Sequence, residues 1–166
     1  MKLTGLKTMC VILLGFTLVF FSCFKETEKK SGFQPLPDSG FRAELTIKQI
    51  PAELKMGENG SAIIRVKNIS DQTWPFRGDS KENYGVNLSY YLFNEAGDTP
   101  YGDGERTYLP KDLKPGESVE LTAFIKAPFK PGKYQIRFEM VQEAVAWFGH
   151  KNKDNYSKPS AISINP

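Results

Sequence analysis

The chain has 166 residues, a length that suits one domain preceded by a short leader. Its 22 lysines and arginines nearly balance 19 acidic residues, so charge gives no reason to expect a nucleic-acid partner. A single histidine excludes a multi-histidine metal site.

The first 22 residues have the pattern of a secretory signal peptide. Lys2 and Lys7 precede an apolar run over residues 10–21, and the small residue Ser22 follows it. The run is about a dozen residues long, shorter than the roughly 20 that a helix needs to cross a bilayer. We therefore expect cleavage, with a short membrane-spanning anchor as the alternative.

The end of this run, Phe20-Phe21-Ser22-Cys23, resembles the relaxed lipobox of lipoproteins from spirochaetes and some other bacteria. The resemblance implies that Cys23 is acylated, that the signal 1–22 is cut before it, and that the lipid holds the protein at a membrane. Because Phe24 rather than Asp follows, it favours the outer membrane, on the periplasmic or surface face. Cys10 would leave with the signal, so no cysteine remains in the fold for a disulfide or a zinc site, and we expect no metal and no cofactor.

Composition divides the rest of the chain in two. Residues 23–40 are charged and then rich in Pro, Gly and Ser, without a hydrophobic period, and this indicates a lipidated N-terminus and a flexible tether. Residues 41–166 have the length of one domain. Turn residues such as Gly57, Gly97 and Pro131-Gly132 punctuate that domain.

Six segments of the domain alternate between apolar and polar residues, as strands with one buried face do. They are the stretches 43–47, 62–66, 86–93, 119–125, 134–140 and 161–164. No stretch shows a convincing helical stripe. About seven short strands in this length predict an all-β, immunoglobulin-like sandwich of two antiparallel sheets.

Two aromatic residues have positions typical of such sandwiches. The sequence Pro131-Gly132-Lys133-Tyr134 predicts a tyrosine corner, in which the Tyr134 hydroxyl binds nearby backbone at the start of a late strand. Trp74 is expected to cap one end of the core, with Pro75 directing the chain away from it.

Several motifs resemble a broad group of bacterial immunoglobulin-like domains. VKNISDQTWP resembles the loop after their second strand, and VNLSYYLFNEAGD with the following GERTYLP to AWF stretch is similar to domains found alone or attached to bacterial glycosyltransferases and surface-polysaccharide proteins. The resemblance covers nearly the whole folded part. It implies a fold and no particular function, because this sandwich hosts many roles.

Signals for catalysis are weak. His150 lies in a polar loop without partners for a Ser-His-Asp relay, so we expect it to be solvated. Glu95, Asp98, Asp103 and Glu105 cluster in one loop but lack EF-hand spacing, which leaves calcium as an alternative to a solvated hairpin loop. No phosphate-cradling glycine motif occurs. We expect no enzyme, with a hydrolase as the remote alternative.

Aromatic residues offer the best candidates for a binding site. Residues predicted on outer faces or at a strand end, with one acidic neighbour, are Tyr91, Phe93, Phe124, Trp147, Phe148 and Glu143. Exposed aromatic rings stack on sugars or anchor protein partners. The alternative is that they pack under loops, and the resemblance favours packing for Trp147-Phe148, a recurring signature of the group.

We therefore expect a monomeric, non-catalytic binding module for a cell-envelope glycan or protein. The second hypothesis is an accessory lipoprotein that docks on a larger envelope complex.

Overall fold

The computed structural model describes residues 33–166, and all that follows concerns this part of the chain. The predicted signal peptide and Cys23 lie outside the described residues. No helix in residues 33–166 is long and apolar enough to cross a membrane.

Six long strands coincide with the six alternating segments. They are β1 (Ala43–Gln49), β3 (Asn59–Asn68), β4 (Val86–Phe93), β7 (Ser118–Lys126), β8 (Gly132–Gln142) and β10 (Ser160–Asn165). Four short strands lie between them: β2 (Glu53–Lys55), β5 (Pro100–Asp103), β6 (Thr107–Tyr108) and β9 (Ala146–Trp147). A single helical turn, α1 (Phe148–Lys151), and two 3₁₀ turns, η1 (Asp38–Gly40) and η2 (Lys153–Asn155), complete the domain.

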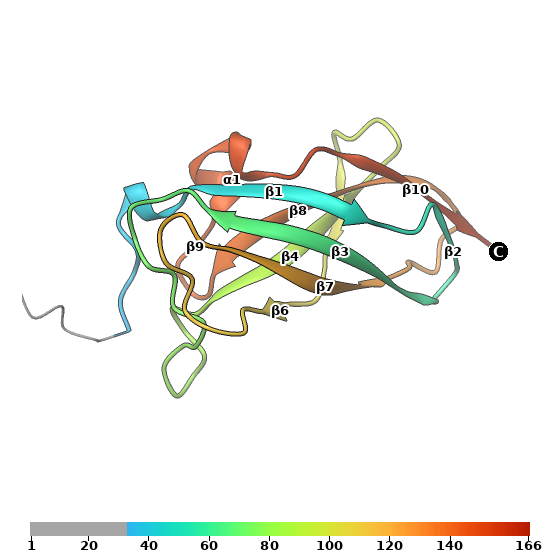
Figure 1. The fold of residues 1–166 in the computed structure, drawn as a ribbon. Coiled ribbons are helices and arrows are strands. Elements are labelled where there is room, and N and C mark those ends of the chain that lie inside the picture. Colours follow the sequence, from blue (N-terminus) through green and yellow to red (C-terminus); the bar gives the residue numbers. More distant parts are fainter. Residues whose placement is uncertain (1–32) are drawn as a thin grey trace, which may run out of the picture. The chain divides into compact units, whose positions relative to one another are not determined.

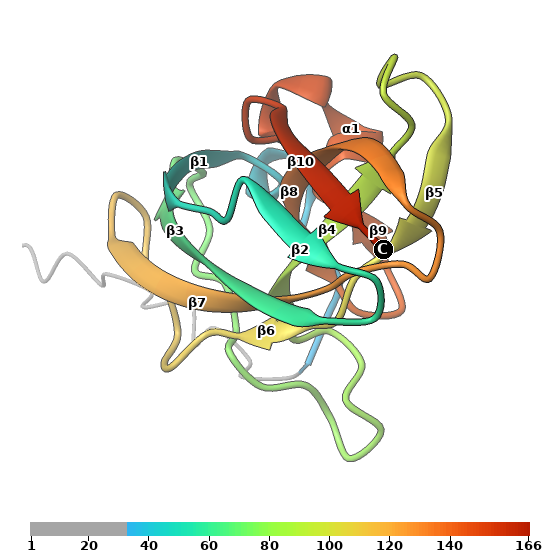
Figure 2. The ribbon, with the colours of Figure 1, turned by 90° about the vertical axis from the view of Figure 1, so that its right-hand side faces the viewer.

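The strands form the two sheets of an immunoglobulin-like sandwich, which confirms the predicted fold (Figure 1). The smaller sheet has the order β1-β3-β7, and the larger has the order β2-β10-β8-β4-β5, with β6 beside β4 and β9 beside β8. Every pairing is antiparallel except that of β10 with β2. Figure 2 shows the two layers from the end at which the chain terminates.

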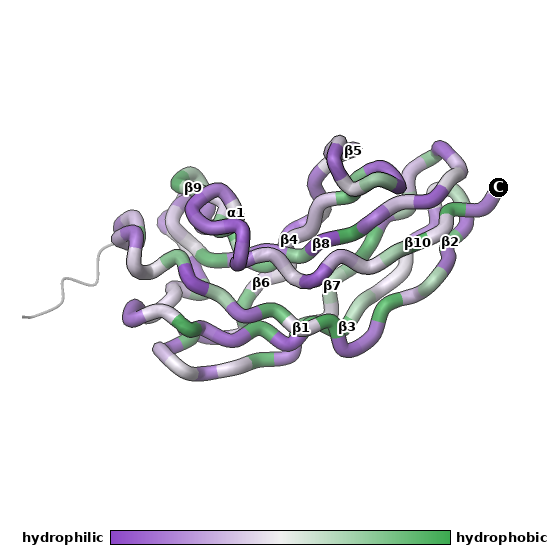
Figure 3. Tube along the Cα trace, turned by 90° about the horizontal axis from the view of Figure 1, so that it is seen from above, coloured by the Kyte–Doolittle hydropathy of each residue, from purple (hydrophilic) through white to green (hydrophobic). Residues whose placement is uncertain are grey.

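The core lies between the sheets because alternation places the apolar residues of each strand on its inner face. Figure 3 shows green and purple positions alternating along the strands. Ile64 of β3 and Leu88 of β4 are fully buried, and so are Ile136, Phe138 and Met140 of β8. Removal of this apolar surface from water is the main stabilising contribution to such a fold.

Three aromatic rings close one end of the core. The ring of Phe148 meets the rings of Phe41 and Trp74 edge-on, at centroid distances of 4.9 and 5.2 Å. Nε1 of Trp74 donates a hydrogen bond to the Gly40 carbonyl oxygen at 2.9 Å, so its only polar group is satisfied. Trp74 thus caps the core as predicted.

The tyrosine corner is also present. The Tyr134 hydroxyl donates to the Lys130 carbonyl oxygen at 2.9 Å. Gly132, at the start of β8, has a φ of 150°, a backbone conformation that other residues rarely adopt. The hydroxyl therefore ties the turn between β7 and β8 to the strand that follows it.

Residues 33–40, which composition assigned to the tether, lie against the domain. The side chain of Gln142 is fully buried and binds this segment twice. Its Oε1 accepts from the Leu36 amide at 2.8 Å, and its Nε2 donates to the Gln34 carbonyl oxygen at 3.1 Å. Leu36 also packs on the core. The packed unit therefore begins before Phe41.

Candidate functional site

The outer face of the larger sheet carries most of the predicted binding residues. Alternation along β4 directs Tyr91 and Phe93 away from the core. Arg137 of β8 stands opposite Tyr91. Trp147 of β9 pairs with Val141 of β8 and joins the same face. The sheet thus brings together side chains that are far apart in the chain.

Three rings on this face form what we call the aromatic row: Trp147, Tyr91 and Phe93. The centroid of Tyr91 lies 4.8 Å from that of Trp147 and 6.2 Å from that of Phe93. An arginine lies over each end, because Cζ of Arg106 is 4.5 Å from the Trp147 ring and Cζ of Arg137 is 4.5 Å from the Phe93 ring. All three rings are half-buried, and neighbouring rings are inclined to each other by 47° and 51°, so each keeps a part that solvent reaches.

Arg106 is held firmly at its end of the row. Its Nε donates to Oε1 of Glu143 at 2.9 Å, and its Nη1 donates to Oγ of Ser89 at 3.2 Å and to the Gly104 carbonyl oxygen at 3.1 Å. Charge-assisted bonds of this kind are stronger than neutral ones. The guanidinium therefore keeps its position over Trp147 before any ligand arrives.

A carboxyl group is buried beneath the row. Oε2 of Glu139 accepts from the Gly149 amide at 2.6 Å, and its Oε1 has no hydrogen-bond partner within residues 33–166. Burial raises the pKa of Glu139 to about 7, against the opposing effects of the Gly149 amide and the Tyr156 hydroxyl. Burial, and then the nearby Glu139 charge, raise the pKa of Tyr156 to about 12. The support under the row therefore changes its charge near neutral pH.

The aromatic row lies between two hollows. The one at the Arg106 end has a volume of about 350 Å³ and is lined by polar side chains, Glu143 among them. The one at the Arg137 end is a groove of about 850 Å³ that includes Phe93 and Tyr156.

The remaining two predicted residues lie elsewhere. Phe148 is fully buried against Trp74, so the prediction that it contacts a ligand is wrong. The reason is local: Trp147 has extended backbone at the end of β9, and successive residues of an extended chain point to opposite faces, so an outward Trp147 leaves Phe148 pointing inward. Phe124 lies on β7 in the other sheet and is 62% exposed, so it is a surface residue outside the row.

The weaker chemical candidates show no assembled site. His150 is exposed on α1, as expected of a solvated histidine. In the described part of the chain, the acidic side chains of the 95–105 loop form no group of three that would hold a metal ion. Asp98 instead accepts a hydrogen bond from Nδ2 of Asn94 at 2.7 Å, which orders the hairpin.

Of the charged residues on this face, Glu143 was predicted from the sequence, whereas Arg106, Arg137 and Glu139 were not. Glu139 was on the outer side of a predicted strand, and alternation alone would have placed it there. Arg106 carried no such signal, because its position depends on β6 returning along the edge of β4, where Tyr108 pairs with Asn87. The return of β6 along β4 depends on contacts between distant residues, so no pattern in the neighbouring sequence predicts it.

No family model matches the sequence, and no curated protein is significantly similar to it. A β-glucosidase from Listeria innocua is similar over 75% of this chain and 16% of that one, with 16% identity and a TM-score of 0.44. The CARDB domain of a Pyrococcus furiosus protein is similar over 74% of this chain and 95% of that one, with 18% identity and a TM-score of 0.41.

A third similar structure is an alkylpurine DNA glycosylase from Pseudomonas fluorescens, bound to DNA that contains an abasic-site analogue. The likeness covers 75% of this chain and 30% of that one, with 8% identity and a TM-score of 0.45. This chain thus spans less than a third of the length of either enzyme. Likenesses this distant support no inference about activity.

Proposed function

We propose that the domain is a non-catalytic binding module that holds an extended glycan along the aromatic row. The observation that carries the proposal is the alignment of Trp147, Tyr91 and Phe93 on one face between two hollows. Sugar rings have apolar faces that stack on aromatic side chains, and their hydroxyls bind charged and amide groups. The arginine at each end supplies such donors.

The shape of the face, rather than its composition, favours a glycan over a protein partner. Hot spots of protein interfaces are also rich in Trp, Tyr and Arg, but they lie in well-packed pockets that become fully desolvated. The aromatic row is narrow, its rings are already half-buried, and charged groups such as Arg106, Glu143 and Arg137 border it. A ligand rich in hydroxyls matches a surface that alternates between rings and charges.

The proposal assigns no catalysis to this face. A glycosidase needs two carboxyl groups on either side of the scissile bond. Glu139 has no exposed surface, and Oε1 of Glu143 is occupied by Arg106 and by Nδ2 of Asn87. Glu139 therefore does not face a bound sugar, and Glu143 is held as the partner of Arg106 rather than as a free acid.

A glycan array tests the proposal directly. Wild-type protein would be applied to oligosaccharides from bacterial envelope polysaccharides and peptidoglycan, beside Trp147→Ala, Tyr91→Ala and Phe124→Ala. We expect the first two variants to lose at least about tenfold in affinity while remaining folded, because ring stacking is removed. Phe124→Ala, which removes an exposed ring from the other sheet, is the matched control and should bind like wild type.

Two results would overturn the glycan assignment. One is the absence of binding to any oligosaccharide, and the other is binding that Trp147→Ala and Tyr91→Ala leave unchanged. Capture of one fixed envelope protein by the wild-type domain, lost in the same two variants, would instead support the accessory role.

We further propose that the domain is tethered to the outer membrane by lipid on Cys23. The support is the Phe20-Phe21-Ser22-Cys23 pattern and the absence of Asp after it. Mass spectrometry of the mature protein is expected to show an N-terminal Cys23 carrying acyl chains. An unmodified chain that begins at Met1 would contradict the anchor without affecting the glycan proposal.

A further inference from the structure

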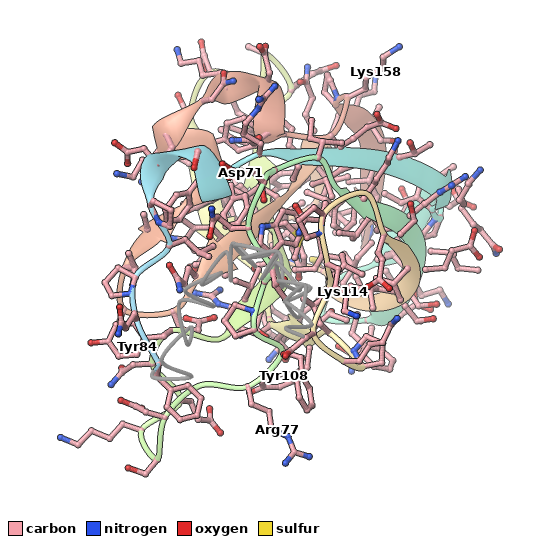
Figure 4. All side chains as sticks on the ribbon, turned by 60° about the vertical axis from the view of Figure 1, so that its left-hand side comes forward. Asp71, Arg77, Tyr84, Tyr108, Lys114 and Lys158 are labelled. Carbon is pink, nitrogen blue, oxygen red and sulfur yellow. The ribbon has the colours of Figure 1, made fainter. Side chains whose placement is uncertain are left out.

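The hollow at the Arg106 end of the row, here called the polar pocket, has features of a binding site in its own right. Its lining comes from the loop before β4, from β4, from the loop between β5 and β6, from β6, and from the turn after β8: Lys81, Glu82, Asn83, Asn87, Arg106, Tyr108, Glu143 and Ala144. Figure 4 shows Tyr84, Tyr108 and Arg77 at one edge of the domain and Lys158 at the opposite edge.

The first feature is an unused acceptor. Asn87 is only 3% exposed, and its Nδ2 donates to Oε1 of Glu143 at 3.0 Å. Its Oδ1 has no donor within residues 33–166. Buried polar atoms almost always have a partner, and one without a partner is costly. A ligand that donates a hydrogen bond here would remove that cost.

The second feature is backbone strain. The non-glycine residues with positive φ in the described part of the chain are Glu82 (62°), Tyr84 (72°) and Ala144 (58°), and all three line or adjoin the polar pocket. The Tyr84 amide donates to the Glu143 carbonyl oxygen at 2.9 Å, and the Glu143 amide donates to that of Gly85 at 3.0 Å. Such strain persists only where surrounding contacts impose it, and it concentrates at functional sites.

The third feature is the balance of charges and hydrogen-bonding groups. The positive charges of Lys81 and Arg106 balance the negative charges of Glu82 and Glu143, so the lining is neutral overall. Nη2 of Arg106 and Oε2 of Glu143 form no hydrogen bond within residues 33–166, which leaves one donor and one acceptor without partners on two bonded side chains. An anion would meet the Glu143 carboxylate, and a cation would meet Arg106. A neutral hydroxyl, which both donates and accepts, suits the pair.

A ring is available at the rim. Tyr108 is 57% exposed, and its hydroxyl lies 3.5 Å from Oε2 of Glu82. Its backbone pairs with Asn87, so the ring stands at the edge of the pocket, next to the unused acceptor. An exposed tyrosine beside paired polar groups offers stacking and hydrogen bonding to the same small ring.

We infer that the polar pocket is a subsite for one uncharged sugar ring at the end of the glycan. The ring stacks on Tyr108, and its hydroxyls donate to Glu143 and accept from Arg106. The buried Oδ1 of Asn87 is reached only if the Arg106–Glu143 pair moves, and the subsite does not depend on that contact. This inference rests on the proposed glycan function, because Arg106 joins the polar pocket to Trp147 in the aromatic row.

Calorimetry with the full chain tests the inference. The probes are the tightest-binding neutral oligosaccharide from the array and the same compound without its terminal sugar. Tyr108→Ala and Glu143→Gln should each weaken binding of the longer compound about tenfold, through lost stacking and a lost charged acceptor. Tyr101→Ala, which alters a tyrosine that is 50% exposed on β5, is the control and should leave binding within about twofold.

The shorter compound identifies the subsite. It should bind about tenfold more weakly than the longer one, and Tyr108→Ala should not weaken it further. Loss of affinity in Trp147→Ala with no change in Tyr108→Ala and Glu143→Gln would overturn the subsite and leave the glycan function intact. Unchanged affinity in Trp147→Ala would overturn the glycan function itself. Thermal unfolding of each variant confirms that a loss of binding is not a loss of fold.

Discussion

Trp147 and Phe148 are adjacent in the chain and lie on opposite sides of the larger sheet. The Phe148 ring meets the rings of Phe41 and Trp74 edge-on, whereas the Trp147 ring lies tilted against Tyr91 and has the guanidinium of Arg106 over it. Both are large aromatic residues within one strand-to-helix junction. Their neighbours make the difference: Phe148 is fully buried among rings, one of which carries the Lys151 ammonium on its outer side, and Trp147 belongs to a half-buried row with a guanidinium over each end. The two clusters should therefore respond differently to mutation.

The largest expected effect comes from the buried cluster. Phe148→Ala removes a fully buried ring and leaves a cavity, so we expect a loss of about 3–5 kcal/mol in the free energy of unfolding. Trp147→Ala removes a half-buried ring and should cost less than half as much. Urea denaturation of both variants measures the comparison, and equal losses would contradict the separation of the clusters.

The next effect belongs to the carboxyl group under the aromatic row. The pKa of Glu139 is about 7 in the folded protein, above its ordinary value of 4.5, so the folded state binds this proton more tightly than the unfolded state does. Its contribution to stability is therefore complete below pH 4.5 and is lost as the pH rises through 7. The loss is at most about 3 kcal/mol.

Glu139→Gln isolates this contribution, because glutamine keeps an acceptor for the Gly149 amide and does not titrate. Unfolding free energies measured across this pH range should fall for wild type and remain nearly level for the variant. Parallel curves would show that the buried carboxyl is not responsible.

A smaller effect on the free energy of unfolding is expected when the hydroxyl of Tyr134 is removed and its ring is kept. Tyr134 packs its ring in the core, as Phe148 does, but its hydroxyl also donates to the Lys130 carbonyl oxygen. Tyr134→Phe keeps the ring and removes the hydrogen bond, so we expect a loss of about 1 kcal/mol. Thermal or urea unfolding measures it, and a loss as large as that of Phe148→Ala would contradict this division.

The smallest effect is expected on the other sheet. Phe124 is highly exposed on β7, so Phe124→Ala should change the free energy of unfolding by less than about 0.5 kcal/mol. The measurement is the same urea titration. A loss of more than about 1 kcal/mol would show that this ring packs against something that its exposure does not reveal.

The alternation of apolar and polar residues explains which features of the structure were predicted correctly from the sequence. A period of two placed Tyr91 and Phe93 on the outer face of β4 and Leu88 in the core, and the tyrosine corner followed from Pro131-Gly132 and Tyr134. These features depend on neighbouring residues alone. They were sufficient for the fold and for part of the site.

Features set by distant contacts were missed. Residues 33–40 were interpreted as part of a tether because their hydrogen-bonding partner, the buried side chain of Gln142, is more than a hundred positions away in the sequence. Arg106 reaches Trp147 only because β6 returns along β4. Phe148 was misplaced for a different reason: it was grouped with Trp147 at a strand end, although successive residues of an extended chain point to opposite faces. Long-range pairing, by contrast, leaves no local pattern.

Chemical-shift mapping tests the central claim most directly. The tightest-binding oligosaccharide from the array would be titrated into isotope-labelled protein, and amide shifts would be followed residue by residue. The account predicts that the shifts concentrate on β4, β8 and β9, around Tyr91, Arg137 and Trp147. Shifts concentrated on β1, β3 and β7 would place the ligand on the opposite sheet and contradict it.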